Sequence, residues 1–373
     1  MHDLSQIKIN RNSNESITTQ LKEQLTWLIA NNSFKQGDRL PAMRVIAQAL
    51  EININTVRSV YSKMAADGLV EIRQGSGIRV LPLEVEGFLR PAGDHKSHTL
   101  GVILPSISNP FFHAFLQGIE KAAKLGQQLL LVCDAHDDPA LCYQYFLQLV
   151  AKKVDGIIVS SFDILESGLL NTKSKGDFFR GLPVVTADWP DKQNNAVCID
   201  MENAGYLATR HLIEHGHHRI GFINFRDEVA NVAVVERGYQ KAMLEHGLQP
   251  DSDLIAIADG FDLQHGEIGC AALMSKVNQP TAILGISDLV AIGAMRWLRS
   301  NGINVPGDVA VVGIDDIPLA NLIEPKLTTV RLPAYEMGNK AMLMLNQLIT
   351  NEIGDSPVLS LPVELVIRQS CGH

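Results

Sequence analysis

Apolar residues in the first 80 positions recur at the spacing of helices. Residues 16–34 carry them at intervals of three or four, which predicts a helix with one buried face. Pro41 then opens a short second helix in MRVIAQAL, because proline fits the first turn of a helix. Asn53 can cap a third helix that runs to Asp67 and ends at Gly68.

The pattern changes to short strands in the segment LVEIRQGSGIRVL. Two apolar stretches flank the glycine turn of residues 74–77, which predicts a hairpin. Three helices followed by a hairpin are the order of a winged helix-turn-helix, in which the third helix enters DNA. On that helix Val57, Val60 and Met64 form an apolar stripe that we assign to the core. Tyr61 belongs to the same stripe, and we expect its hydroxyl to turn to a DNA phosphate.

The segments PAMRVIA, NINTVRSVYSKMAADGLV and RQGSG stand in a specific order. Over residues 5–80 they resemble the winged head of GntR-type bacterial transcription regulators. The resemblance implies operator DNA as a partner, with arginines on guanine edges or phosphates and Asn and Thr on base edges or backbone. A wing glycine lets the backbone approach a phosphate. The implied DNA-binding residues are Arg44, Asn53, Asn55, Thr56, Arg58, Gln74 and Gly75.

From residue 99 the chain alternates between short runs of Val, Ile and Leu, such as TLGVILP and VAVVGID, and helical stretches. This alternation predicts an α/β fold, a two-lobed, doubly wound parallel sheet. Residues 81–98 have no sustained period and contain two prolines and two glycines, which is typical of a linker. We therefore expect a DNA-binding domain at 1–80, a linker at 81–98 and an effector-binding and dimerisation domain at 99–373.

Ligands in doubly wound sheets bind outside the carboxyl ends of the strands, where this sequence places aspartates, aromatics and one arginine. A carboxylate accepts two hydroxyl protons, a guanidinium donates to oxygens, and an aromatic face covers the C–H side of a sugar. A strand-end aspartate also commonly caps the next helix, and this alternative stays open for each one. The aspartates concerned include Asp163, Asp188, Asp200, Asp288, Asp315 and Asp316.

A second set of motifs, which includes GVILPSISNPFF, HLIEHGHHRIGFI, ERGYQKAM, SDLVAIGAM and VPGDVAVVGIDD, resembles the effector domain of LacI/GalR-type repressors over about residues 99–370. Such domains are similar to periplasmic sugar-binding proteins. The resemblance implies a small sugar effector between two lobes, with Arg237 and Asp315 matching the family's effector-holding arginine and aspartate. The implied effector-binding residues are Phe111, Phe112, Phe115, Asp188, Arg237, Phe261, Ser287, Asp315 and Arg331.

Two positions leave the identity of the effector open. Ser287 departs from the asparagine that is frequent before the aspartate of its motif, and Arg331 lies where other members vary. Arg331 would tolerate an acidic or phosphorylated effector.

A GntR-type head on a LacI-type body resembles the arabinose repressor type of bacterial regulator. It implies a sequence-specific regulator, expected to repress carbohydrate uptake and catabolism genes, whose operator affinity changes with a bound sugar. Two alternatives stay open. One is a co-repressor-dependent or activating regulator that responds to a nucleoside or sugar phosphate, and the other is a sugar-binding protein that does not bind DNA. A homodimer is expected, because a dimer reads a two-fold operator.

Charge supports a head that touches nucleic acid. Residues 1–80 carry ten basic and seven acidic side chains, whereas the rest of the chain carries 22 and 34. A basic head on an acidic body is the distribution that a DNA contact confined to the head would produce. Residues 1–14 contain no signal-peptide pattern and no segment is apolar enough to span a membrane. We therefore expect a cytoplasmic protein with no membrane partner.

Two other kinds of site were considered. His211 and His215 are four positions apart, next to His217 and His218, a spacing that could hold zinc. HLIEHGHHRIGFI is explained without metal as a helix, a glycine stop and a strand, so no metal and no cofactor is predicted. The sequence has no G-x-S-x-G, H-E-x-x-H or P-loop motif, and we predict that the protein is not an enzyme.

Overall fold

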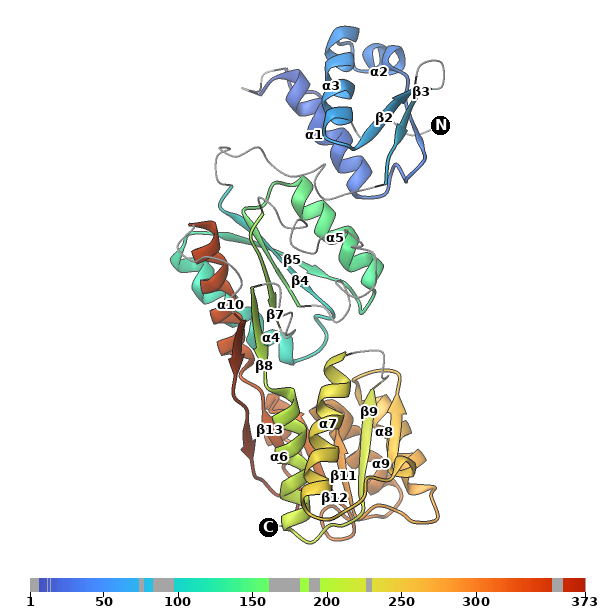
Figure 1. Cartoon of the computed structure of the whole chain (residues 1–373), viewed down its shortest axis with the longest axis vertical. Helices are drawn as coiled ribbons and strands as arrows, with labels where there is room; N and C mark the ends of the chain where they lie inside the picture. Colours follow the sequence, from blue (N-terminus) through green and yellow to red (C-terminus); the bar gives the residue numbers. More distant parts are fainter. Residues whose placement is uncertain are drawn as a thin grey trace. The chain divides into compact units, whose positions relative to one another are not determined.

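The computed structural model describes residues 7–11, 13, 15–73, 77–82, 97–160, 182–187, 195–225, 230–350 and 358–372 (Figure 1). The chain divides into two compact units. The first comprises Met1–Pro105, Ala123–Val185 and Met344–Asp355. The second comprises Ser106–Ala122, Thr186–Leu343 and Ser356–His373. Most of the predicted linker, residues 83–96, lies outside the described residues.

The N-terminal segment of the first unit, residues 7–82, forms the predicted three helices and hairpin, and we call it the head. Its elements are α1 (Ile17–Ala30), β1 (Arg39–Leu40), α2 (Met43–Ala49), α3 (Ile54–Ala66), β2 (Val70–Arg73) and β3 (Gly77–Val80). Ser16 begins α1 by accepting the N–H of Thr19, and Asn53 begins α3 by accepting the N–H of Asn55. The two-residue strand β1, which pairs with β3, was not predicted.

One six-stranded sheet has the order β14-β8-β7-β6-β4-β5. Its strands are β4 (Thr99–Leu104), β5 (Leu129–Asp134), β6 (Gly156–Val159), β7 (Val184–Ala187), β8 (Ala196–Ile199) and β14 (Val358–Leu361). The helices α4 (Phe111–Leu125) and α5 (Pro139–Ala151) follow β4 and β5. Every residue of β6, β7 and β8 is buried and all but Thr186 are apolar, as expected for a parallel sheet covered on both faces.

The second six-stranded sheet has the order β10-β9-β11-β12-β13-β15, and only β15 runs antiparallel to its neighbour. Its strands are β9 (Ile220–Phe225), β10 (Ile255–Ala258), β11 (Ala282–Gly285), β12 (Ala310–Asp315), β13 (Thr328–Arg331) and β15 (Glu364–Val366). The remaining helices are α6 (Met201–Glu214), α7 (Ala230–Glu245), α8 (Leu263–Met274), α9 (Asp288–Ser300) and α10 (Ala334–Ile349). Two parallel sheets with alternating helices confirm the predicted α/β fold class.

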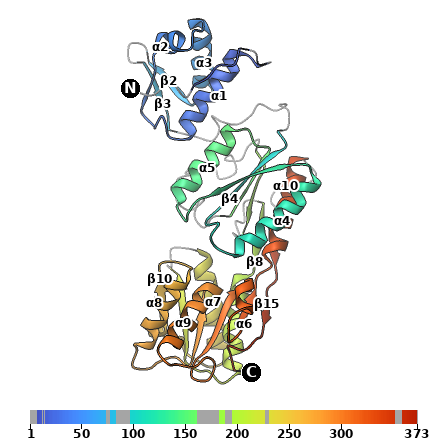
Figure 2. The same cartoon turned by 180° about the vertical axis from the view of Figure 1, so that it is seen from behind.

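Three pairs of helices in the second unit cross at glycines, which let the backbones approach closely. A Cβ added to Gly205 on α6 would overlap the carbonyl oxygen of Val235 on α7, and one added to Gly238 on α7 would overlap that of Glu202 on α6. The same reciprocal arrangement joins α8 with α9 through Gly266 and Gly293, helices that lie side by side in Figure 2. Gly118 on α4 and Gly338 on α10 form the third such pair.

None of the helices that the structure describes is both long enough and apolar enough to span a membrane.

We expect Gly238→Ala to destabilise the second unit. The new Cβ would meet the Glu202 carbonyl oxygen and lie 2.7 Å from the Tyr206 nitrogen, both backbone atoms that cannot rotate away. Overpacking of this kind costs about 1–3 kcal/mol, which exceeds the roughly 1 kcal/mol that alanine gains over glycine in a helix. The free energy of unfolding in urea measures the loss. Gly307→Ala is the control, because its nearest neighbour would be the Asn304 Cβ at 3.6 Å; equal losses in both variants would contradict the prediction.

Candidate functional site

The head exposes most of the predicted DNA-binding residues on α2 and α3. Arg44, Asn53, Asn55 and Arg58 are exposed and Thr56 is half-buried. The guanidinium of Arg58 donates to Oδ1 of Asn55 at 3.1 Å, so both side chains lie together near the start of α3. The other face of α3 is the predicted apolar stripe, now confirmed as fully buried. Gln74 and Gly75 lie outside the described residues.

The expectation for the Tyr61 hydroxyl was wrong. Tyr61 is fully buried, and its hydroxyl donates to the carbonyl oxygen of Pro41 at 2.7 Å. Burial raises the pKa of this phenol well above its usual value. The side chain fixes the entry to α2 against α3, and so it positions the two helices relative to each other instead of contacting a phosphate.

In the second unit, the carboxyl ends of five parallel strands share one edge of the sheet. At this edge Phe261 and Ser287 lie in the loops that leave β10 and β11, and Asp315 and Arg331 are the last residues of β12 and β13. We call these four residues the edge cluster. The structure therefore places four of the predicted effector-binding residues where doubly wound sheets bind ligands.

Aromatic and hydroxyl groups order one half of this edge. The ring of Phe225, at the end of β9, stacks on the ring of Phe261 with centroids 4.3 Å apart. Ser287 caps α9 by accepting the N–H of Val290 at 3.3 Å, and its hydroxyl donates to the Phe261 carbonyl at 3.3 Å. Phe225 was missed in the sequence, although its position at the end of a strand could have singled it out.

Charged groups occupy the other half. Asp315 and Arg331 are register partners on the neighbouring strands β12 and β13. The Nε of Arg331 donates to Asp316 at 2.7 Å and its Nη1 to Glu364 at 3.1 Å. Arg368 also donates to Asp316. Asp316 stood beside Asp315 in the sequence, whereas Glu364 and Arg368 gave no signal, because they reach the edge from the C-terminal segment.

Asp288, the first residue of α9, is a fully buried carboxyl beneath this edge. It accepts the N–H of Ile317 at 2.8 Å and the hydroxyl of Thr329. Burial raises the pKa of Asp288 to about 7, against the lowering effect of these two hydrogen bonds. Gly313 on β12 leaves the room for the carboxyl, since a Cβ there would overlap Oδ1 of Asp288.

Four of the remaining predicted effector residues, Arg237 and the three phenylalanines of α4, have partners other than the edge cluster. Arg237 on α7 pairs with Glu202 on α6 at 3.6 Å. The rings of Phe111, Phe112 and Phe115 on α4 pack edge to face on one another and are buried. Asp188 and Asp163 lie outside the described residues, and Asp200 caps α6 by accepting the N–H of Asn203.

The crowded histidines have other partners. His211 Nε2 lies 3.2 Å from the Cys371 sulfur, and His215 Nδ1 lies 2.6 Å from the His211 carbonyl oxygen. His217 Nδ1 contacts the Thr281 hydroxyl at 3.1 Å. In the part of the chain that the structure describes, no three His, Cys, Asp or Glu side chains are grouped as metal ligands would be.

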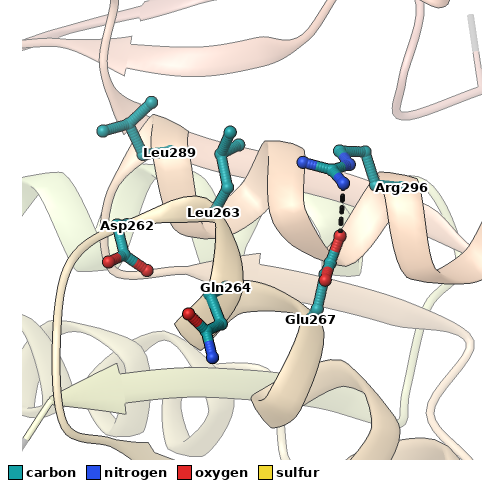
Figure 3. Close-up of a pocket in the computed structure, with 6 residues that line it drawn as sticks. All are labelled: Asp262, Leu263, Gln264, Glu267, Leu289 and Arg296. Carbon is teal, nitrogen blue, oxygen red and sulfur yellow. Dashed lines mark ion pairs between the residues drawn. The ribbon is translucent and has the colours of Figure 1, made fainter.

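An open hollow of about 480 Å³ lies where the first turns of α8 meet α9 (Figure 3). Asp262, Gln264 and Glu267 line it from the α8 side, and Glu267 pairs with Arg296 of α9 at 3.1 Å. None of its lining residues belongs to the edge cluster.

Comparison with protein families gives two matches. Residues 17–80 match the family model of bacterial regulatory proteins of the gntR family. Residues 209–371 match the model of the periplasmic binding protein-like domain.

Among characterised proteins, the chain is 31% identical to catabolite control protein A of Priestia megaterium, over 75% of this chain and 84% of that protein. It is 29% identical to the ribose operon repressor of Haemophilus influenzae, over 89% of this chain and 98% of the repressor. Among solved structures, a LacI family transcriptional regulator from Enterococcus faecium with bound ribose matches with a TM-score of 0.63 and 26% identity, over 73% and 98% of the two chains.

The buried carboxyl of Asp288 predicts a pH dependence of stability. Its pKa is about 7 in the folded protein and about 3.8 when exposed, so between these values the folded state holds a proton that the unfolded state has released. Stability therefore falls as the pH rises from 4 to 7, by at most about 1.4 kcal/mol per pH unit. The free energy of unfolding in urea is measured for wild type and Asp288→Asn at pH 5, 6 and 7, and the difference between the two proteins at each pH isolates this contribution. A difference that does not change with pH would contradict the prediction.

Proposed function

Because this chain belongs to the LacI/GalR family of transcription regulators, we propose that its head binds an operator and that a small neutral sugar at the edge cluster changes the operator affinity. The chain joins a GntR-type head to a domain of the periplasmic-binding-protein type. By their names, one of the relatives given above is a ribose operon repressor and the other is a catabolite control protein.

The exposed polar start of α3 supports operator binding through the major groove. Asn53 and Asn55 are exposed there with Arg58, and the buried stripe of the same helix orients them. Arginine and asparagine are the side chains that read guanine and adenine edges in pairs of hydrogen bonds. We propose that Arg44, Thr56, Gln74 and Gly75 contribute contacts to the backbone or to bases beside them.

The proposal of a neutral effector is supported by the ion pairs of Arg331. Its guanidinium is already bound to the carboxylates of Asp316 and Glu364, although 48% of the side chain stays exposed. At this edge the carboxylates of Asp316 and Glu364 already pair with the guanidiniums of Arg331 and Arg368. A phosphate group, which adds nearly two negative charges, would have to compete with these carboxylates for the same guanidiniums, whereas sugar hydroxyl groups can both donate and accept here.

Two sheet edges support a homodimer. β5 ends the first sheet and exposes Leu129, Leu131 and Val132, at 72%, 41% and 42%. β10 ends the second sheet and exposes Ile257 at 50%. Exposed apolar side chains on edge strands are commonly covered by another chain. Two copies would present two heads, as a two-fold operator requires.

Operator binding is tested on a DNA site selected from a random pool by the wild-type protein. We expect Arg58→Ala to lower the affinity by about 1–3 kcal/mol and to relax the selectivity at one base pair, as the loss of an arginine–guanine contact does. Binding is measured by gel shift at fixed salt. Lys276→Ala removes one positive charge from a surface pair with Asp253 in the second unit and serves as the control. Equal affinities for Arg58→Ala and wild type would refute the role of α3.

Effector binding is tested by measuring operator affinity and thermal unfolding with added D-ribose, L-arabinose, D-xylose or D-glucose. We expect one of them to raise the unfolding midpoint and to change the operator affinity about 5–150-fold, the range of ordinary allosteric coupling. Ribose 5-phosphate, glucose 6-phosphate and adenosine form the comparison set. A response to a phosphorylated compound or a nucleoside, with none to the neutral sugars, would replace the proposed effector class.

A further inference from the structure

The turn after β12 has an uncommon backbone conformation. Asp315 has a φ of 131° and Asp316 a φ of 60°, both in the region that favours glycine. Aspartate enters this region more readily than most residues, but such a conformation persists only where the surroundings hold it. What holds the turn therefore decides where the Asp315 carboxylate and its register partner Arg331 lie.

One support comes from below the sheet edge. The carboxyl of Asp288 accepts the N–H of Ile317 on one oxygen and the hydroxyl of Thr329 on the other. The same hydroxyl of Thr329 lies 3.4 Å from the N–H of Asp316 and can accept from it. A single buried side chain on α9 thus fixes the turn and β13 together, and glycine at position 313 is what admits it.

A second support comes from the C-terminal segment. Asp316, with 10% of its side chain exposed, bridges Arg331 and Arg368. Arg368 is itself held, because its Nη1 donates to the Leu327 carbonyl at 2.8 Å and its N–H to the Thr328 hydroxyl at 2.8 Å. The carboxylate of Asp316 is therefore clamped between two guanidiniums, one of which belongs to the edge cluster.

From this geometry we infer that Asp288 and Asp316 are positioning residues, which hold the turn of residues 315–317 so that Asp315 and Arg331 face an effector together. The inference rests on the proposed effector site. It assigns a role to two carboxyl groups that do not themselves bind the effector, because their oxygens already accept hydrogen bonds from groups of the protein.

The test separates local holding of the turn from general stability. Asp316→Asn removes the charge that both guanidiniums bind while keeping the size of the side chain. Asp288→Leu removes both acceptors, and Asp288→Asn restores them in part, since its amide oxygen can accept from Ile317 and its NH₂ can donate to Thr329. Asp253→Asn is the matched control, because it breaks an exposed pair with Lys276 in the same unit.

Hydrogen–deuterium exchange of full-length protein is followed in peptides that cover residues 313–332, and D-ribose, L-arabinose, D-xylose and D-glucose are titrated by calorimetry. We expect Asp316→Asn and Asp288→Leu to speed exchange at the turn at least tenfold and to weaken the sugar at least tenfold. Asp288→Asn and Asp253→Asn should keep wild-type exchange and sugar affinity.

The outcomes that overturn the inference are distinct from failure of the proposed function. Unchanged exchange at the turn in Asp316→Asn would show that the clamp does not hold it, whether or not any sugar binds. Faster exchange with unchanged sugar affinity would show that the turn is held but does not position the effector residues. If wild type binds none of the four sugars, the proposed function fails. The exchange measured in Asp316→Asn and in Asp288→Leu, with Asp288→Asn as the rescue of Asp288→Leu, still decides whether these carboxyls hold the turn. If Asp288→Leu does not fold, Asp316→Asn alone carries the comparison.

Discussion

The edge of the second sheet depends on the carboxyl group of Asp288, which is buried beneath it and accepts hydrogen bonds from the turn after β12 and from β13. Taking a carboxylate out of water is costly unless hydrogen bonds compensate. Asp288 accepts hydrogen bonds from the N–H of Ile317 and the hydroxyl of Thr329, and burial raises its pKa to about 7, so it stays uncharged below that pH. These bonds connect the start of α9, the turn after β12 and the strand β13. These three segments thus meet at one side chain, beneath the edge where parallel sheets bind ligands.

Elements with a period or a cap were predictable from the sequence, and those fixed only by tertiary contacts were not. The three helices of the head follow from apolar spacing and from caps such as Ser16 and Asn53. The strand β1 has two residues, too few to show any alternation, and it exists because it pairs with β3. The hydroxyl of Tyr61 finds the Pro41 carbonyl, a partner twenty residues away that no local pattern reveals.

The same distinction applies to the candidate site. Ser287 and Asp315 could be predicted because they stand at the ends of apolar runs, and the parallel sheet brings the ends of its strands to one edge, whereas Arg331 came from the family resemblance. Glu364 escaped notice because β15 is antiparallel and reaches the edge from the far end of the chain. The alternative of a helix cap is correct for Asp200, whereas Asp288, the first residue of α9, is buried beneath the sheet edge, where Gly313 leaves room for it.

The C-terminal segment joins the strands of this edge to one another and to α6. Beyond Arg368, the hydroxyl of Ser370 donates to the Val311 carbonyl on β12 and accepts the N–H of Thr328 on β13. The sulfur of Cys371 then contacts both Thr328 and His211 on α6. A displacement of the turn would strain bonds that reach two strands and a helix at once. A ligand that binds one arrangement of the turn better than another therefore acts on all of these elements, since a ligand shifts a conformational equilibrium by its difference in affinity for the two states.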